Sequence, residues 1–186
     1  MAKTIDEYLS EITTLVGNRD LSMRWYRDKV REIVPRKLNE SNIISSIREG
    51  NSSVRPTYGD MNLFYYNPKL RQSLPYYDVF PLVIPVQRYT DGFLGINFHY
   101  LSIPMRLGLL EHMQKVTAPG KEAGWRAVSK IRFIKPCVKR YLATQVKSRF
   151  LFIDEEQTQI AAMMPVQKFK KQGDRKVHAD SRRMVN

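Results

Sequence analysis

The chain lacks most features on which enzymes and secreted proteins depend. It holds one cysteine, Cys137, in 186 residues, so an internal disulfide is excluded and a zinc cluster is implausible. No apolar run approaches the roughly 20 residues of a membrane-spanning helix. The first residues are amphipathic and acidic, which is not the pattern of a signal peptide. Composition therefore predicts an intracellular, soluble protein with no membrane partner.

Motifs for nucleotide or metal chemistry are also missing. The glycines, Gly92 and Gly95 among them, lack the spacing of a phosphate-binding loop. The three histidines are scattered, and the carboxylates at 154–156 are typical of a helix start. We therefore expect no catalytic residue, no metal and no cofactor. A nucleic-acid-processing enzyme is the least favoured function.

Two side chains have a chemical alternative beside their structural one. His99 can pair with Asp78 or Asp91 as an acid–base couple, although a strand histidine bonded to backbone is the commoner arrangement. Cys137 stands beside Lys135 and Lys139, which favours a thiolate. A small buried thiol is nevertheless the default for a lone cysteine.

Positive charge is the strongest compositional feature. Lys and Arg number 31 against 18 Asp and Glu, for a net charge of +13. Residues 125–186 hold 15 basic and 5 acidic residues, whereas residues 1–124 hold 16 and 13. A basic back half favours nucleic acid as partner, because each neutralised phosphate releases counterions. The alternatives are an acidic protein neighbour in an assembly and a solvated basic surface.

The front of the chain predicts helices. Apolar residues recur at helical spacing, and Pro35 ends the second of the helices. The predicted helices span 4–17, 21–34 and 38–48. The turn-rich stretch 50–60 then separates an N-terminal helical segment, 1–49, from a core domain, 60–164.

Beyond residue 60 the pattern predicts short strands interrupted by helices. The predicted strands are 61–67, 79–88, 93–100, 131–134 and 150–153; the predicted helices are 104–116, 136–148 and one that begins at Asp154; the stretch 117–125 is a predicted loop. Pro81 and Pro85 place their strand at a sheet edge or at a bulge. Asp91-Gly92 predicts a hairpin turn. The fold class is α+β, with a small antiparallel sheet or an SH3-like barrel, N-terminal helices and flanking helices.

After Pro165 the chain is polar and basic, which predicts an extended C-terminal tail over 165–186 that is disordered or ordered only by a partner. The predicted partner-binding residues of this tail are Lys168, Phe169, Lys170, Lys171, Arg175, Lys176, Arg182 and Arg183. Deletion of residues 166–186 is expected to weaken assembly or DNA binding while changing the Tm little.

A second basic segment is interleaved with aromatic residues. The candidate nucleic-acid-binding residues are Arg126, Lys130, Arg132, Lys135, Lys139, Arg140, Lys147 and Arg149. Such contacts position a duplex without reading its sequence. An exposed indole, Trp25 or Trp125, would then stack on the terminal base pair.

Several stretches of the chain contain sequence motifs that are similar to those of one protein family. They are LPYYDVFPL (74–82), GFLGINFHYL (92–101), the Pro-Met-Arg-Leu helix start (104–107), MRWYRDKV (23–30), FIKPCVKRYLATQVKSRF (133–150) and DSRRM (180–184). In these stretches the chain resembles a family of small virion proteins of T4-type contractile-tailed bacteriophages.

The resemblance implies a non-enzymatic virion structural protein of the DNA end protector type, which binds the termini of packaged double-stranded DNA. The alternative is a structural subunit of the tail, neck or baseplate whose basic tail binds a neighbouring subunit during head-tail assembly. Either reading implies other virion proteins as partners. It also implies a location in the virion and, during assembly, in the host cytoplasm.

Overall fold

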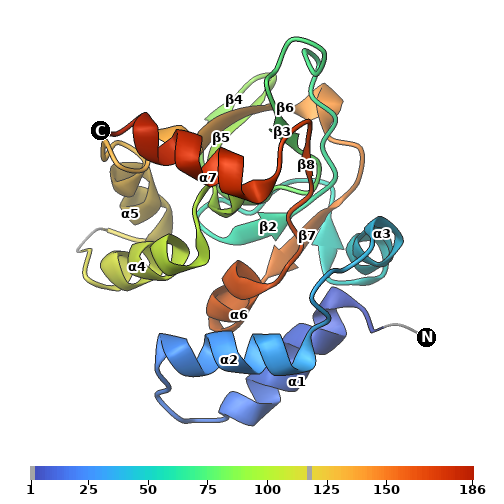
Figure 1. Ribbon diagram of the computed structural model, residues 1–186, viewed down its shortest axis with the longest axis vertical. Helices are drawn as coiled ribbons and strands as arrows, with labels where there is room; N and C mark the ends of the chain where they lie inside the picture. Colours follow the sequence, from blue (N-terminus) through green and yellow to red (C-terminus); the bar gives the residue numbers. More distant parts are fainter. Residues whose placement is uncertain (1–2, 117–118) are drawn as a thin grey trace.

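An antiparallel sheet of six strands lies at the centre of the computed structural model, which describes residues 3–116 and 119–186 (Figure 1). Its strands, in spatial order, are β1 (Ser52–Ser53), β7 (Phe150–Ile153), β2 (Met61–Leu63), β4 (Leu82–Tyr89), β5 (Gly92–Asn97) and β6 (Val138–Leu142). The two edge strands do not pair with each other within the described residues, so the sheet is open. The α+β class is confirmed, and the SH3-like barrel is wrong.

The hairpin of β4 and β5 forms the middle of this sheet. Its register pairs Tyr89 with Gly92, so Thr90 and Asp91 make the turn. The register shifts between Pro85 and Gln87, which confirms a bulge at Pro85, whereas Pro81 lies just before the strand. The edge-strand alternative is wrong, because β4 pairs with β2 on one side and β5 on the other. Beyond residue 83 the β2 side of β4 has no strand partner, so Pro85, which lacks an amide hydrogen, leaves no ladder bond unmade there.

Seven helices are described, and they surround the sheet on one side and at its ends. They are α1 (Ile5–Val16), α2 (Met23–Ile33), α3 (Glu40–Glu49), α4 (Ile103–Gln114), α5 (Lys121–Val128), α6 (Thr158–Met163) and α7 (Asp174–Arg183). The predicted helices at 4–17, 21–34, 38–48 and 104–116 are confirmed as α1 to α4. Thr4 and Glu7 form a capping box that fixes the start of α1. No helix in the described part of the chain is long and apolar enough to cross a membrane.

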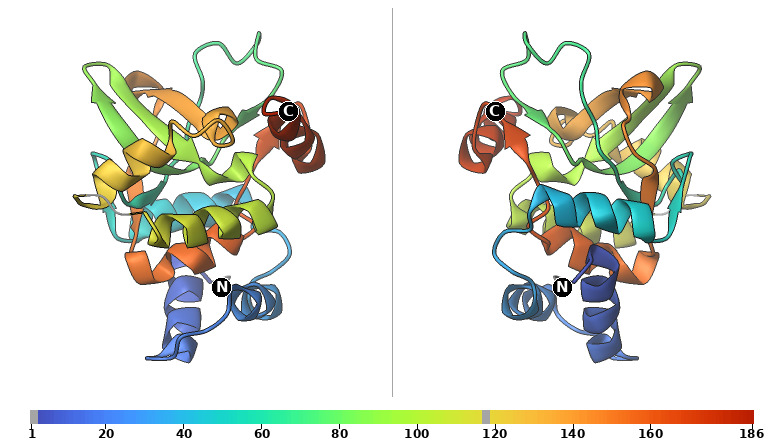
Figure 2. Two further views of the ribbon diagram at one scale, coloured as in Figure 1. Left: turned by 90° about the vertical axis from the view of Figure 1, so that its left-hand side faces the viewer. Right: turned by 90° about the vertical axis from the view of Figure 1, so that its right-hand side faces the viewer.

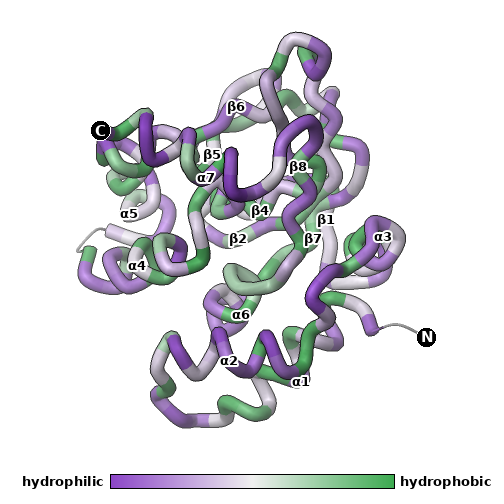
Figure 3. Tube along the Cα trace, in the orientation of Figure 1, coloured by the Kyte–Doolittle hydropathy of each residue, from purple (hydrophilic) through white to green (hydrophobic). Residues whose placement is uncertain are grey.

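The buried side chains form two clusters. The larger lies between the sheet and the helices, and α6 packs there against α1, α2 and α4. Figure 3 shows α2 and α7 mostly in purple, as expected of helices that bury only a narrow apolar stripe. The smaller cluster, largely aromatic, consists of Phe64, Tyr66, Val83, Phe93, Tyr141 and Phe150. It gives the second face of the sheet its own core.

The segment from residue 117 to 149 differs most from the predicted elements. Residues 117–118 of the predicted loop lie outside the described residues, and 121–128 form α5. Residues 131–134 form a turn instead of a strand, and the predicted helix 136–148 is wrong, since it contains β6. Val138 packs against the larger cluster and Tyr141 belongs to the smaller one. Their spacing of three, which suits a helix, also places side chains on opposite faces of a strand.

The C-terminal segment is folded against the rest of the chain. β8 (Phe169–Lys170) pairs with β3 (Tyr77–Asp78) in a second, two-stranded sheet, and α7 buries Val177 completely. The expectation of an extended tail is therefore wrong, because the chain itself supplies the surface that orders it. The division into three segments remains a prediction. Residues of all three, such as Ile5, Leu82 and Val177, belong to one cluster.

Candidate nucleic-acid interface

The tip of the β4–β5 hairpin gathers basic side chains from several elements. The Arg88 guanidinium lies 4.0 Å from the centroid of the Tyr58 ring, and its Nη2 is 4.0 Å from Oε2 of Glu122. Glu122 also accepts a hydrogen bond of 2.9 Å from Nη2 of Arg126. Arg126 in turn donates from Nε to the Val86 carbonyl at 3.0 Å. Helix α5 thus holds Arg126 beside Arg88 through a shared carboxylate.

On the other side of the hairpin tip lies Arg140 of β6. Its guanidinium is 3.7 Å from the centroid of the Tyr89 ring, and it forms an ion pair with Asp91 in the turn. Cation–π contacts of this kind fix a guanidinium plane without consuming its hydrogen-bond donors. Two arginine–tyrosine pairs therefore flank the hairpin tip.

A cavity of about 530 Å³ opens beside these pairs, at the hairpin end of the sheet. We call it the sheet-end cavity. Arg55, Tyr58, Arg88 and Tyr89 are among its lining residues, as are Phe93 and Phe150 of the smaller aromatic cluster. None of its lining residues, all within the described ranges, is acidic. It is an aromatic hollow edged with guanidinium groups.

Two more of the predicted residues lie next to this cavity. Lys147 and Arg149 flank Ser148, which lines it. Arg149 donates from Nη2 to the Ser52 carbonyl at 2.8 Å, and Lys147 donates to the Thr144 carbonyl at 2.8 Å. Lys147 and Arg149 are both exposed. The structure therefore brings four of the eight candidates, Arg126, Arg140, Lys147 and Arg149, to one end of the sheet.

The other four candidates lie elsewhere. Lys130, Arg132 and Lys135 are exposed in the turns between α5 and β6. The same turns carry Ile131 and Phe133, which line an apolar hollow of about 300 Å³. Lys139 is only partly exposed, and its Nζ lies 4.1 Å from the centroid of the Tyr100 ring. Burial lowers the pKa of its ammonium group.

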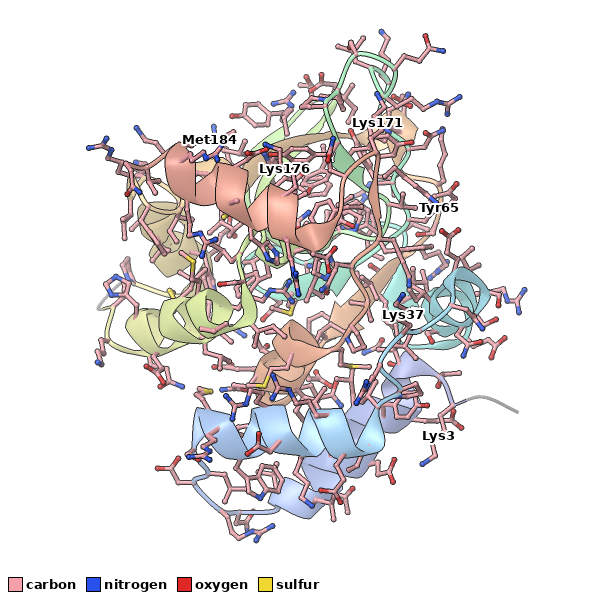
Figure 4. All side chains as sticks on the ribbon, viewed as in Figure 1. Lys3, Lys37, Tyr65, Lys171, Lys176 and Met184 are labelled. Atoms are coloured by element: carbon pink, nitrogen blue, oxygen red, sulfur yellow. The ribbon has the colours of Figure 1, made fainter. Side chains whose placement is uncertain are left out.

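The predicted partner-binding residues of the C-terminal segment divide in the same way. Phe169 packs against Tyr76 and Tyr100, so it belongs to the fold. Lys170 pairs with Glu40 at 3.0 Å, Lys171 donates to the carbonyls of Gln72 and Leu74, and Lys176 pairs with Asp180 at 2.8 Å. The Lys168 carbonyl accepts a hydrogen bond of 2.9 Å from the amide of Val79, which follows β3. Arg175, Arg182 and Arg183 are exposed on α7; Figure 4 labels Lys171 and Lys176 at the end of the molecule opposite Lys3.

Neither tryptophan stands at the sheet-end cavity. Trp125 is 5% exposed and packs edge-on against Phe98, so it cannot stack on a base. Trp25 is half-buried on α2, beside Tyr26 and Arg19. At this cavity the exposed aromatic ring is that of Tyr89, and sequence reasoning missed it together with Arg55, Tyr58 and Arg88. The available signal was an arginine within three residues of a tyrosine in two turn-rich stretches, VRPTYG and RYTDG.

His99 and Cys137, the two residues for which the sequence also allowed a chemical role, are buried. His99 does pair with Asp78, at 2.7 Å, but both side chains are almost fully enclosed. Burial raises the pKa of the Cys137 thiol to about 12, which disfavours the reactive thiolate. Within residues 3–116 and 119–186 no three His, Cys, Asp or Glu side chains are grouped so as to hold a metal ion.

Acidic side chains gather at the opposite end of the molecule. Two hollows lie beside α1 and the turn that follows β7, one next to α2 and the other next to α3, and their acidic lining residues are Asp6, Glu7, Glu49, Asp154, Glu155 and Glu156. In both views of Figure 2 the β4–β5 hairpin points to the top and α1 lies at the bottom. The hollows at the two ends of the molecule therefore differ in charge: carboxylates line those beside α1, whereas arginines and no acidic residue line the sheet-end cavity.

Comparison with known proteins gives one match. A family model described as "Phage T4 terminal DNA protecting protein" matches residues 14–183, which include all the elements from α2 to α7. No curated protein and no solved structure matches the chain. Because the family model covers nearly the whole chain, including both sides of the sheet-end cavity, the protein belongs to the family of the phage T4 terminal DNA protecting protein.

Proposed function

We propose that this protein covers the ends of double-stranded DNA in the phage virion with the surface around the sheet-end cavity. The family is that of a protein that protects terminal DNA. The observation that carries the proposal is the meeting of Arg55, Arg88, Arg126, Arg140 and Arg149 at one end of the sheet, beside a cavity that no acidic residue lines. A duplex end offers phosphates of both strands and an uncovered base pair, which suits such a surface.

The arginines at the sheet end determine which side of the protein approaches DNA. Exposed charges act over a Debye length of roughly 8 to 10 Å at moderate salt. The arginines of the sheet end attract the phosphates more strongly than the mixed charges around α1 and α3 do. Binding in this orientation involves no bond cleavage, so the role is that of a non-enzymatic cover.

The test compares DNA with and without ends. We expect the protein to bind a linear blunt duplex of about 30 base pairs more tightly than a covalently closed minicircle of the same composition. The logarithm of the binding constant should fall steeply with the logarithm of the salt concentration. Equal affinity for the two DNAs contradicts end recognition, and absence of binding at about 50 mM salt contradicts a DNA role altogether.

A double variant locates the surface. Arg88→Gln with Arg126→Gln removes two charges at the hairpin tip and should weaken binding to the linear duplex at least tenfold, since two phosphate contacts are lost. Arg48→Gln is the matched control, because Arg48 is exposed at the acidic end and pairs with Glu49. If the control weakens binding as much as the double variant, the site does not lie at the sheet end.

A second candidate function is attachment to another virion protein. It is favoured by Ile131 and Phe133, which are each 40% exposed beside the apolar hollow and alternate with Lys130 and Arg132. A structural subunit of the neck or tail would use such a surface for a neighbouring subunit. Counting copies per particle by quantitative mass spectrometry separates the two roles: one or two copies favour the DNA end, and a multiple of three or six favours a structural ring.

A further inference from the structure

We propose that the sheet-end cavity holds one unpaired nucleotide at the terminus of the DNA, so that the protein prefers ends with a single-stranded extension. This inference rests on the proposed function and narrows its substrate. The juxtaposition that carries it is an aromatic hollow with two arginines and two tyrosines among its lining residues.

The size of the cavity suits a single nucleotide. Sites for small molecules measure roughly 300 to 1,000 Å³, and the sheet-end cavity, at about 530 Å³, lies in the middle of this range. A base pair with both of its backbones does not fit into such a volume. A nucleotide must therefore leave the stack before it enters, at a cost of a few kcal/mol, which is least for a nucleotide that is already unpaired.

The lining suits a nucleobase. Phe93 and Phe150 are buried members of the aromatic cluster, and both are among the residues that line the cavity. Tyr58 packs on this cluster, whereas Tyr89 remains 40% exposed. The rings of Tyr58 and Tyr89, which are not buried, can stack on a base of any sequence, because every base has a π face. A virion protein that covers DNA ends has no need to read their sequence.

The arginines suit the phosphate. The Arg88 side chain is 69% exposed, and at 4.0 Å its contact with Glu122 lies at the limit of an ion pair. Its guanidinium lies 4.0 Å from the centroid of the Tyr58 ring, and because the side chain is mostly exposed, its N–H donors can bind a phosphate in a bidentate arrangement. Arg55 is exposed and forms no ion pair with any described residue. A ligand with an aromatic ring and an adjacent phosphate satisfies both sets of groups.

The experiment compares two DNAs that differ in one nucleotide. Binding of the full-length protein is measured for a blunt duplex and for the same duplex with a single-nucleotide extension, on the 3′ strand and on the 5′ strand in turn. We expect one of the extended duplexes to bind roughly tenfold more tightly than the blunt one, as one stacked base allows. Equal dissociation constants for blunt and extended duplexes overturn the inference.

Variants then assign the preference to the cavity. In Arg55→Gln and in Tyr58→Leu the ratio of the two dissociation constants should fall to about one, because a phosphate contact or a stacking surface is lost. The leucine keeps the apolar packing of Tyr58 on Phe93. Arg48→Gln, at the acidic end, should keep the full ratio. If both cavity variants keep it as well, the extension binds elsewhere and the inference is wrong.

Two further results separate this inference from the function on which it rests. A protein that prefers linear DNA to the minicircle but treats blunt and extended ends alike keeps the proposed function and loses the nucleotide site. A protein that binds free dAMP as tightly as the extended duplex also contradicts the inference, because the cavity would then accept nucleotides that are not part of a DNA end.

Discussion

His99 and Asp78 form a buried pair in which Nδ1 of the imidazole lies 2.7 Å from Oδ2 of the carboxylate. Asn97 donates to the same oxygen at 3.0 Å and to the Tyr141 hydroxyl at 3.1 Å. The Phe80 amide donates to the other carboxylate oxygen at 3.2 Å. This network links β3, β5 and β6, and it is almost fully enclosed.

The pair predicts loss of stability in acid. Burial lowers the pKa of His99 below its ordinary 6.5, and the Asp78 carboxylate offsets this only in part. Nε2 has no hydrogen-bond partner among the described residues, so a protonated ring would bury an unpaired N–H. Burial would raise the pKa of Asp78, but His99 and the bonds from Asn97 and the Lys168 amide hold it below 3.8.

Both shifts act in the same direction. Below about pH 6.5 the unfolded chain binds a proton at His99 that the folded protein rejects, so the free energy of unfolding falls as the pH falls. We expect a loss of up to about 2 kcal/mol between pH 7 and about pH 5, and a further loss below about pH 4 as Asp78 is protonated in the unfolded chain.

Urea titrations across this pH range measure the effect, and NMR of the imidazole protons assigns it, because His178 is also partly buried with a lowered pKa. His112→Gln, at an exposed position of α4, is the control and should leave the pH dependence unchanged. A stability that is constant from about pH 7 to pH 5 would show that His99 is protonated in the folded protein.

A second prediction concerns Arg106, which is fully buried on α4. It donates from Nε to the Leu101 carbonyl at 2.8 Å and from Nη1 to the Ala162 carbonyl at 2.9 Å, and so ties α4 to the end of α6. Arg106→Ala leaves two buried carbonyls unpaired and a cavity, which we expect to cost about 3 to 5 kcal/mol. Arg106→Lys should cost less.

Chemical denaturation measures these costs. Arg24→Ala is the matched control, because the Arg24 side chain is 82% exposed, and it should cost less than about 0.5 kcal/mol. An Arg106→Ala protein as stable as the control would show that solvent enters this part of the core and satisfies the carbonyls.

The buried polar residues described above lie in the sequence motifs that carry the family resemblance. Asp78 lies in LPYYDVFPL, Asn97 and His99 in GFLGINFHYL, and Arg106 in the Pro-Met-Arg-Leu helix start. Each is a polar group enclosed in the core, where a specific partner is required. The most recognisable motifs of the chain therefore describe how it folds, whereas the arginines of the sheet-end cavity stand outside most of them.

A third prediction compares two neighbours on β6. Arg140 is exposed at the hairpin tip, whereas Lys139 lies against the Tyr100 ring. Arg140→Gln should reduce the slope of log K against log salt for a linear duplex by about 1, the value for one phosphate contact. Lys139→Gln should leave this slope unchanged and instead lower stability by roughly 0.5 to 2 kcal/mol through the lost cation–π contact. The reverse outcome would place Lys139 at the DNA.

A fourth prediction concerns the single thiol. Cys137 is fully enclosed, and burial raises its pKa to about 12. We therefore expect no reaction with a thiol-specific disulfide reagent at about pH 8 until urea unfolds the protein, and full reaction afterwards. Rapid reaction of the native protein would show that the turn around Lys135–Cys137 opens readily.

Local pattern was sufficient for the regular elements. The helices at 4–17 and 104–116 were predictable, because each combines one apolar period with a cap or a proline at its start. The strand 150–153 was predictable because it is a short continuous apolar run. Local pattern failed for 136–148, where Val138 and Tyr141 serve opposite faces of a sheet. The two side chains are three residues apart because each packs into a different core on opposite faces of a strand, and not because both lie on one face of a helix.

The site was only half predictable, because it is assembled from contacts between distant segments. Arg126 and Arg140 were identifiable as exposed basic residues. Two other residues of the site, Arg88 and Tyr58, come from the hairpin and from the loop before β2, and these segments are joined where Gly59 donates its backbone hydrogen bond to the Pro85 carbonyl. A count of charged residues along the sequence cannot reveal a contact between two distant segments. It also counts Lys139, whose ammonium group lies on an aromatic ring.

The last prediction reverses the sequence-based expectation for the C-terminal segment. Deletion of residues 166–186 removes β8 from its pairing with β3, removes the buried side chains of Val166 and Val177, and removes the 2.9 Å bond from His178 Nε2 to the His99 carbonyl. We expect the truncated protein to melt far below the full chain or to remain unfolded.

Val177→Ala alone should cost about 1 to 3 kcal/mol. Met184→Ala, which truncates a side chain of a residue that is 64% exposed on the same segment, should cost almost nothing. Thermal melts of the three variants decide the matter: if the deletion and Val177→Ala both melt with the full chain, α7 does not contribute to the fold, and the basic segment is the independent tail that its composition indicates.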